Sequence, residues 1–213
     1  MQILPSLLEY TVESLDKKLT LLSQNPRFDL TCQTTLHLHL DFVEEFFAKE
    51  RNIRRSLGFG SVCDRLSAYF SEQTLTLTIH FMGELDDLPK IFKTLQNYPL
   101  NPLWNYLFFV PQAYLPTFTK LAETNVAFGT WFDVDAWQPP ENSETAQLLM
   151  TVKAGLSGQK LTPRVKELAL EFTRRYPNYF VLDGGWSIAA DPRKFGNNVD
   201  LVSHSSFWNT ITA

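Results

Sequence analysis

The stretch "TLHLHLDFVEEFF", residues 35–47, alternates polar and apolar side chains over its first eight positions. Successive side chains of a β-strand point to opposite faces. One face is therefore wholly apolar and consists of Leu36, Leu38, Leu40 and Phe42. The other face carries His37, His39 and Asp41. An α/β barrel accommodates both faces, because one meets the surrounding helices and the other fills the barrel.

The rest of the chain repeats a strand–helix alternation. Strands are predicted at 3–8, 35–42, 74–83, 105–110, 125–131, 146–152, 179–183 and 199–205. The clearest helices are predicted at 11–24, 63–73, 87–98 and 162–176. This alternation predicts a (β/α)8 TIM barrel that forms a single domain over residues 1–213. We expect a reduced fifth helix, because Pro139 and Pro140 interrupt its place, and a short or missing last helix.

Composition excludes several classes of protein. The 213 residues carry a net charge of −4, which gives no reason to expect nucleic acid or an anionic membrane as a partner. Cys32 and Cys63 do not form a disulfide framework or a metal-finger spacing. No signal peptide or membrane-spanning run is apparent, so we expect a cytoplasmic protein.

Polar residues recur on the inward faces of other predicted strands. The third strand places His80 inward and the seventh places Asp183 inward. Active sites of α/β barrels lie at the carboxyl ends of the strands. The polar residues at those ends are His39, Asp41, His80 and Asp183. Two imidazoles and two carboxylates are suitable ligands for one divalent ion of zinc, iron, manganese or cobalt.

The alternative is that each of these residues is a core or loop residue satisfied by its own partner. Four inward polar residues at three strand ends favour a shared site, because burying carboxylates without a cation or donors is costly. His37 precedes His39 by two positions and should lie one layer deeper, as a core residue or as support for a ligand.

Five stretches resemble the signature segments of the ribulose-phosphate 3-epimerase family, in the family's order and at about its spacing. They are "ILPSLL" (3–8), "LHLDFVEE" (38–45), "TIHFM" (78–82), "MTVKAGLSGQKLTPRV" (150–165) and "VLDGGWSI" (181–188). The resemblance is weak from about residue 90 to 145. It implies a carbohydrate isomerase of the pentose phosphate pathway, which epimerises D-ribulose 5-phosphate at C3 with the help of a metal.

The resemblance also implies roles for individual residues. Asp41 and Asp183 would transfer the proton and bind the metal, with His39 and His80 completing the ligand set. Backbone N–H groups after strands six, seven and eight would bind the substrate's phosphate. The residues in those segments are Gly155, Leu156, Ser157, Gly158, Gly184, Gly185, His204 and Ser205. Ser6 and Met82 would line the substrate site, together with His80.

Departures from the family pattern leave the substrate open. "FVEE" replaces the usual Val-Met-Asp-Gly after Asp41, and the loop over 43–55 is highly charged. His204 replaces a glycine at the expected phosphate corner. The same chemistry on another sugar phosphate, such as a ketohexose 6-phosphate, is therefore an alternative, as is a catalytically inactive phosphate-binding paralogue. A shortened last helix should expose apolar surface, so we also expect a homo-oligomer.

Overall fold

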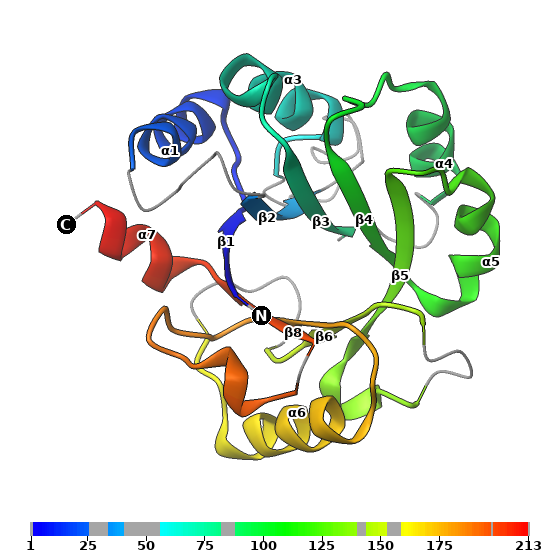
Figure 1. The fold of residues 1–213 in the computed structure, drawn as a ribbon, viewed down its shortest axis with the longest axis vertical. Helices are drawn as coiled ribbons and strands as arrows, with labels where there is room; N and C mark the ends of the chain where they lie inside the picture. Colours follow the sequence, from blue (N-terminus) through cyan, green and yellow to red (C-terminus); the bar gives the residue numbers. More distant parts are fainter. Residues whose placement is uncertain are drawn as a thin grey trace, which may run out of the picture. The chain divides into compact units, whose positions relative to one another are not determined.

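The computed structural model describes residues 2–25, 34–40, 56–81, 88–139, 144–152, 159–196 and 198–212. Eight strands are hydrogen-bonded in chain order and close into a barrel (Figure 1). They are β1 Ile3–Leu7, β2 Thr34–Leu40, β3 Leu75–Phe81, β4 Asn105–Val110, β5 Val126–Asp133, β6 Gln147–Met150, β7 Phe180–Asp183 and β8 Val199–Ser203. The predicted closed barrel of parallel strands is confirmed at this level.

The described helices are fewer and shorter than those of a complete (β/α)8 barrel. They are α1 Val12–Gln24, α3 Phe59–Phe70, α4 Leu88–Asn97, α5 Leu115–Phe118, α6 Pro163–Arg175 and α7 Ser205–Ile211. Between β5 and β6 the described residues contain only a 3-10 turn, Val134–Ala136, as the two prolines predict. The last helix, α7, is present but has only seven residues.

The chain divides into two compact units. One unit consists of Met1–Ser6, Phe109–Thr119 and Phe128–Ala213, and the other of Leu7–Phe108 and Lys120–Ala127. Three strands, β1, β4 and β5, contribute residues to both units. We call the unit that contains Phe128–Ala213 the C-terminal unit and the unit that contains Leu7–Phe108 the N-terminal unit, and we describe each separately.

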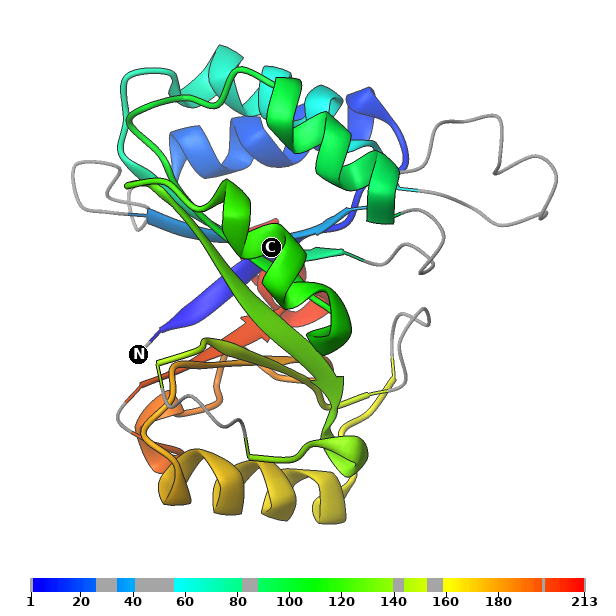
Figure 2. The ribbon, with the colours of Figure 1, turned by 90° about the vertical axis from the view of Figure 1, so that its right-hand side faces the viewer.

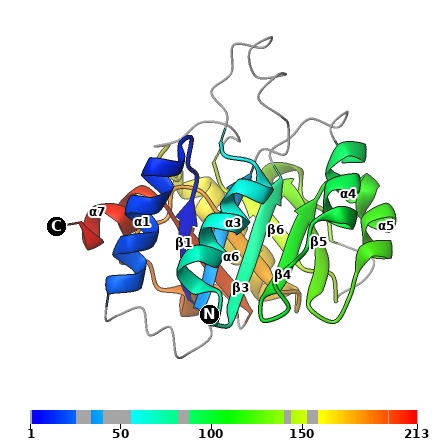
Figure 3. The same ribbon diagram turned by 90° about the horizontal axis from the view of Figure 1, so that it is seen from above.

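In the N-terminal unit α1 and α3 lie side by side (Figures 1 and 3). The Thr11 hydroxyl begins α1 by accepting a hydrogen bond from the Ser14 N–H at 3.2 Å. Leucines at helical spacing form the buried face of α1: Leu15, Leu19 and Leu22. At the helix–helix contact, Arg65 Nε donates to Asp16 Oδ1 at 2.7 Å. This ion pair fixes the two helices where their apolar faces end.

In the C-terminal unit α6 lies along the strands β6, β7 and β8 (Figure 2). Thr162 caps α6 by accepting a hydrogen bond from the Val165 N–H at 3.3 Å, and Pro163 occupies the first turn. The core beneath the helix is apolar and includes Trp137, Leu149, Ala169, Phe180, Leu182 and Leu201. Among the described residues, no helix has both the length and the apolar character needed to cross a membrane.

Cys63 should be chemically inert in the folded protein. Its side chain is buried in α3, and burial raises the pKa of its thiol far above the usual range, with a further contribution from Asp64. The thiolate is the reactive form. We therefore expect no alkylation of Cys63 by iodoacetamide at pH 8 in a Cys32→Ser variant, measured by mass spectrometry. The same sample in guanidinium chloride is the positive control, and rapid alkylation of the native form would contradict the packing described for α3.

Candidate metal centre

The histidines of β2 and β3 lie on adjacent strands in matching register. The strands pair in parallel with His37 opposite Thr78 and His39 opposite His80. Leucines and aromatic residues alternate with them and are almost fully buried, including Leu38 and Phe81. The apolar face of these strands is therefore buried. The face that carries the histidines is buried as well.

Three imidazoles follow one another on this buried face. The ring centroids of His37 and His39 are 4.7 Å apart, and those of His39 and His80 are 5.8 Å apart. His37 Nδ1 lies 2.8 Å from the Thr78 hydroxyl, which donates in turn to the Leu36 carbonyl oxygen at 3.4 Å. When Nδ1 donates this hydrogen bond, Nε2 carries the lone pair, which is the tautomer that binds a metal through Nε2.

Asp183 ends β7 in the C-terminal unit, and its side chain is only 3% exposed. β7 pairs with β6 and β8, where Met150 and Val202 are its register partners. Thr151 follows β6 and holds the end of β7. Its N–H donates to the Asp183 carbonyl oxygen at 2.7 Å, and its hydroxyl lies 2.9 Å from that oxygen and 2.6 Å from the carbonyl oxygen of Gly184.

The turn after Asp183 requires glycine at both of its positions. Gly184 and Gly185 have φ values of 110° and 76°, in the left-handed region that other residues rarely adopt. A Cβ on Gly184 would also lie 2.2 Å from Cγ2 of Val152. The turn therefore brings backbone close to β6 immediately after the Asp183 carboxylate.

The ends of β1 and β8 meet at the Ser6 carbonyl oxygen. It accepts the Trp208 indole N–H at 2.7 Å and lies 3.2 Å from His204 Nδ1. A carbonyl oxygen only accepts hydrogen bonds, so His204 carries its proton on Nδ1 when neutral. Ser6 itself is fully buried, whereas Ser205 is exposed in the first turn of α7. The ring of His204 thus helps to fasten β8 to β1, which its sequence position did not predict.

His37, His39 and Asp183 have the composition of a metal site. The two histidines belong to the N-terminal unit and Asp183 to the C-terminal unit. Two imidazole nitrogens and a carboxylate oxygen can bind a divalent transition metal. The group contains two of the predicted ligands, and it adds His37, which the sequence analysis placed a layer deeper. His80, the predicted fourth ligand, is the register partner of His39.

Several predicted site residues lie outside the described part of the chain. They are Asp41, Met82, Gly155, Leu156, Ser157 and Gly158. The sequence analysis missed Thr78 and Thr151, whose hydroxyls contact His37 and the turn after Asp183. The inward position of Thr78, two residues before His80, was the available signal; nothing in the sequence distinguishes Thr151 from an ordinary strand residue.

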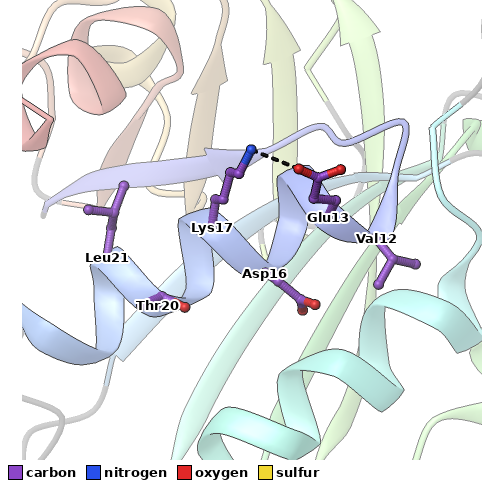
Figure 4. Close-up of a pocket in the computed structure, with 6 residues that line it drawn as sticks. All are labelled: Val12, Glu13, Asp16, Lys17, Thr20 and Leu21. Atoms are coloured by element: carbon purple, nitrogen blue, oxygen red, sulfur yellow. Dashed lines mark hydrogen bonds and ion pairs between the residues drawn. The ribbon is translucent and has the colours of Figure 1, made fainter.

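The surface of α1 carries a separate hollow of about 710 Å³ (Figure 4). It is lined by residues of one helix, among them Val12, Asp16 and Leu21. An exposed ion pair joins Lys17 to Glu13, which lies one turn earlier in the helix, at 2.9 Å. All of its lining residues belong to α1, so they bring no polar groups from different elements together. The hollow therefore lacks the features of a catalytic site.

Comparison of the chain with models of known protein families and with curated proteins finds no match. The assignment of a function therefore depends on the residues of the site and on the resemblance noted in the sequence.

Thr151→Val should destabilise the protein, although the valine side chain has nearly the same shape as that of threonine. The variant loses the hydroxyl that contacts two consecutive carbonyl oxygens, and both become less well satisfied in a buried place. We expect the free energy of unfolding to fall by about 1–3 kcal/mol, measured by urea denaturation. Thr151→Ser is the matched control, because it keeps the hydroxyl. Equal stability of the wild type and Thr151→Val would contradict a role for this contact.

Proposed function

We propose that the protein is a metal-dependent epimerase that inverts C3 of a ketopentose phosphate, converting D-ribulose 5-phosphate to D-xylulose 5-phosphate. The observation that carries this proposal is that His37, His39 and Asp183 are all buried and together form a donor set suited to a divalent transition metal. The resemblance of the surrounding segments to ribulose-phosphate 3-epimerases adds the reaction and the substrate.

The donor set fits a divalent transition metal better than magnesium or calcium. Imidazole suits zinc and iron, whereas magnesium and calcium prefer oxygen ligands alone. When Nδ1 of His37 donates to the Thr78 hydroxyl, Nε2 keeps the lone pair that would bind the metal. When bound, the cation would act as a Lewis acid that stabilises the enediolate formed from the substrate.

Two carboxyl groups would move the proton between the faces of C3. In this proposal Asp183 and Asp41 lie on opposite sides of the substrate, one ionised and one protonated, and exchange these states during each turnover. Thr151 would keep the Asp183 carboxylate in place through the backbone bonds at the end of β7. Asp41 lies outside the described residues, so its role comes from the sequence alone.

The phosphate of the substrate would bind at the carboxyl ends of β7 and β8. Glycines at positions 184 and 185 leave backbone N–H groups without covering side chains, which is what close approach of a phosphate requires. Residues 155–158 and 204–205 would supply further donors. His204 is bulkier than the glycine it replaces, and its ring lies against Ser6. This difference favours the second candidate, the same chemistry on another sugar phosphate.

Metal content tests the first step of the proposal. After incubation with Zn²⁺ and desalting, we expect about one metal ion per chain by inductively coupled plasma mass spectrometry. His39→Ala should bind the metal at least 10–100-fold more weakly, roughly the loss that even outer-shell changes cause. His204→Ala is the matched control and should retain the metal. Comparing His37→Ala with His80→Ala then identifies which imidazole belongs to the ligand set.

Solvent deuterium incorporation at C3 of D-ribulose 5-phosphate tests the reaction. The metal-loaded wild type should exchange this proton, and Asp183→Asn and Asp41→Asn should each slow the exchange by about 10²–10⁴-fold, because each removes one proton-transfer group. Exchange with a ketohexose 6-phosphate alone would select the second candidate. Metal binding without exchange of any sugar phosphate would overturn the epimerase assignment in favour of an inactive paralogue.

A further inference from the structure

A second hollow lies in the C-terminal unit, where the end of α6 meets the loop before β8. Its volume is about 400 Å³, and its lining includes Arg174, Arg175, Asn178 and Asn198. Asn178 and Asn198 precede β7 and β8, so the hollow is at the amino ends of these strands. Asp183 and the glycine turn are at the opposite, carboxyl end of β7. The hollow is thus separate from the proposed catalytic centre.

Two guanidinium groups at this hollow are held in place by the protein. Arg174 donates from Nε and Nη2 to the Lys194 carbonyl oxygen at 3.0 and 2.6 Å, which leaves its other N–H groups available. The Arg175 guanidinium lies over the ring of Tyr176, 5.6 Å from the ring centroid. Arg175 Nη1 also forms an exposed ion pair with Glu171 Oε1, one turn earlier in the helix, at 4.0 Å.

The carboxyl end of α6 lines this hollow, so its dipole opposes an anion there and the charges of the arginines have to outweigh it. The Thr173 hydroxyl donates to the Ala169 carbonyl oxygen, and the Tyr176 N–H donates to that of Phe172. Gly196 lies so close to the helix that a Cβ would be 2.1 Å from the Thr173 carbonyl oxygen. None of the described lining residues is acidic, so the two arginines determine the sign of the charge.

We infer that this hollow binds the phosphate group of a small phosphorylated molecule. A guanidinium presents a planar fork of N–H donors that matches phosphate oxygens, and prior fixation of the side chain reduces the entropy lost on binding. The Asn178 and Asn198 amides at the floor donate to the Thr145 and Pro177 carbonyl oxygens, which fixes their oxygen and nitrogen positions. The site does not depend on the proposed epimerase activity.

Amide chemical shifts of the protein, titrated with inorganic phosphate at constant ionic strength, test the inference. We expect saturable shifts at residues 174–176, 178 and 196, distinct from any at Gly184 and Gly185. Arg175→Gln should weaken this binding by about tenfold or more, which corresponds to the loss of one charge-assisted hydrogen bond. Arg164→Gln, at an exposed position in the first turn of the same helix, should leave it unchanged.

Arg174→Lys distinguishes the contribution of the positive charge from that of the guanidinium group. It keeps the charge and removes the N–H groups that donate to the Lys194 carbonyl oxygen. It should weaken phosphate binding while Arg174→Gln abolishes it. Absence of saturable shifts at 174–176 and 178, or equal affinity in Arg164→Gln and Arg175→Gln, would overturn the inference. Shifts at Gly184 and Gly185 alone would also overturn it, while supporting phosphate binding at the proposed catalytic centre.

Discussion

The burial of both faces of β2 and β3 is the constraint on which the rest of the site depends. A strand with one face in water could carry histidines at little cost, but here His37, Thr78 and His80 are all nearly inaccessible. Each polar atom must then find a partner within the protein or from a ligand. The Thr78 hydroxyl lies within hydrogen-bond distance of one nitrogen of His37.

The same constraint acts differently at the end of β7. There a single hydroxyl, that of Thr151, contacts the carbonyl oxygens of Asp183 and Gly184. The two left-handed glycines let the chain turn away directly after the carboxylate.

Periodicity was sufficient to predict the strands, because alternation in segments such as 35–42 and 74–83 has only one structural explanation. Helix limits were less accurate: α3 begins at Phe59, four residues before the predicted start, since its first turn contains glycine and serine rather than an apolar pattern. The sequence also indicated His39, His80 and Asp183 as inward residues. It could not indicate that His204 would bond to Ser6, because this depends on side-chain orientation and on a contact between remote segments.

The pairing of β1 with β8 bears on how the protein folds. Ile3 is the register partner of Leu201, and the Gln2 N–H donates to Asp200 Oδ1, 198 positions away in the chain. Contacts between such distant residues close very long loops and form late, which slows folding. During synthesis β1 leaves the ribosome long before its partner exists. The edge of the first strand that later pairs with β8 must therefore remain unpaired, and exposed to association with other chains, until residues 199–203 have been made.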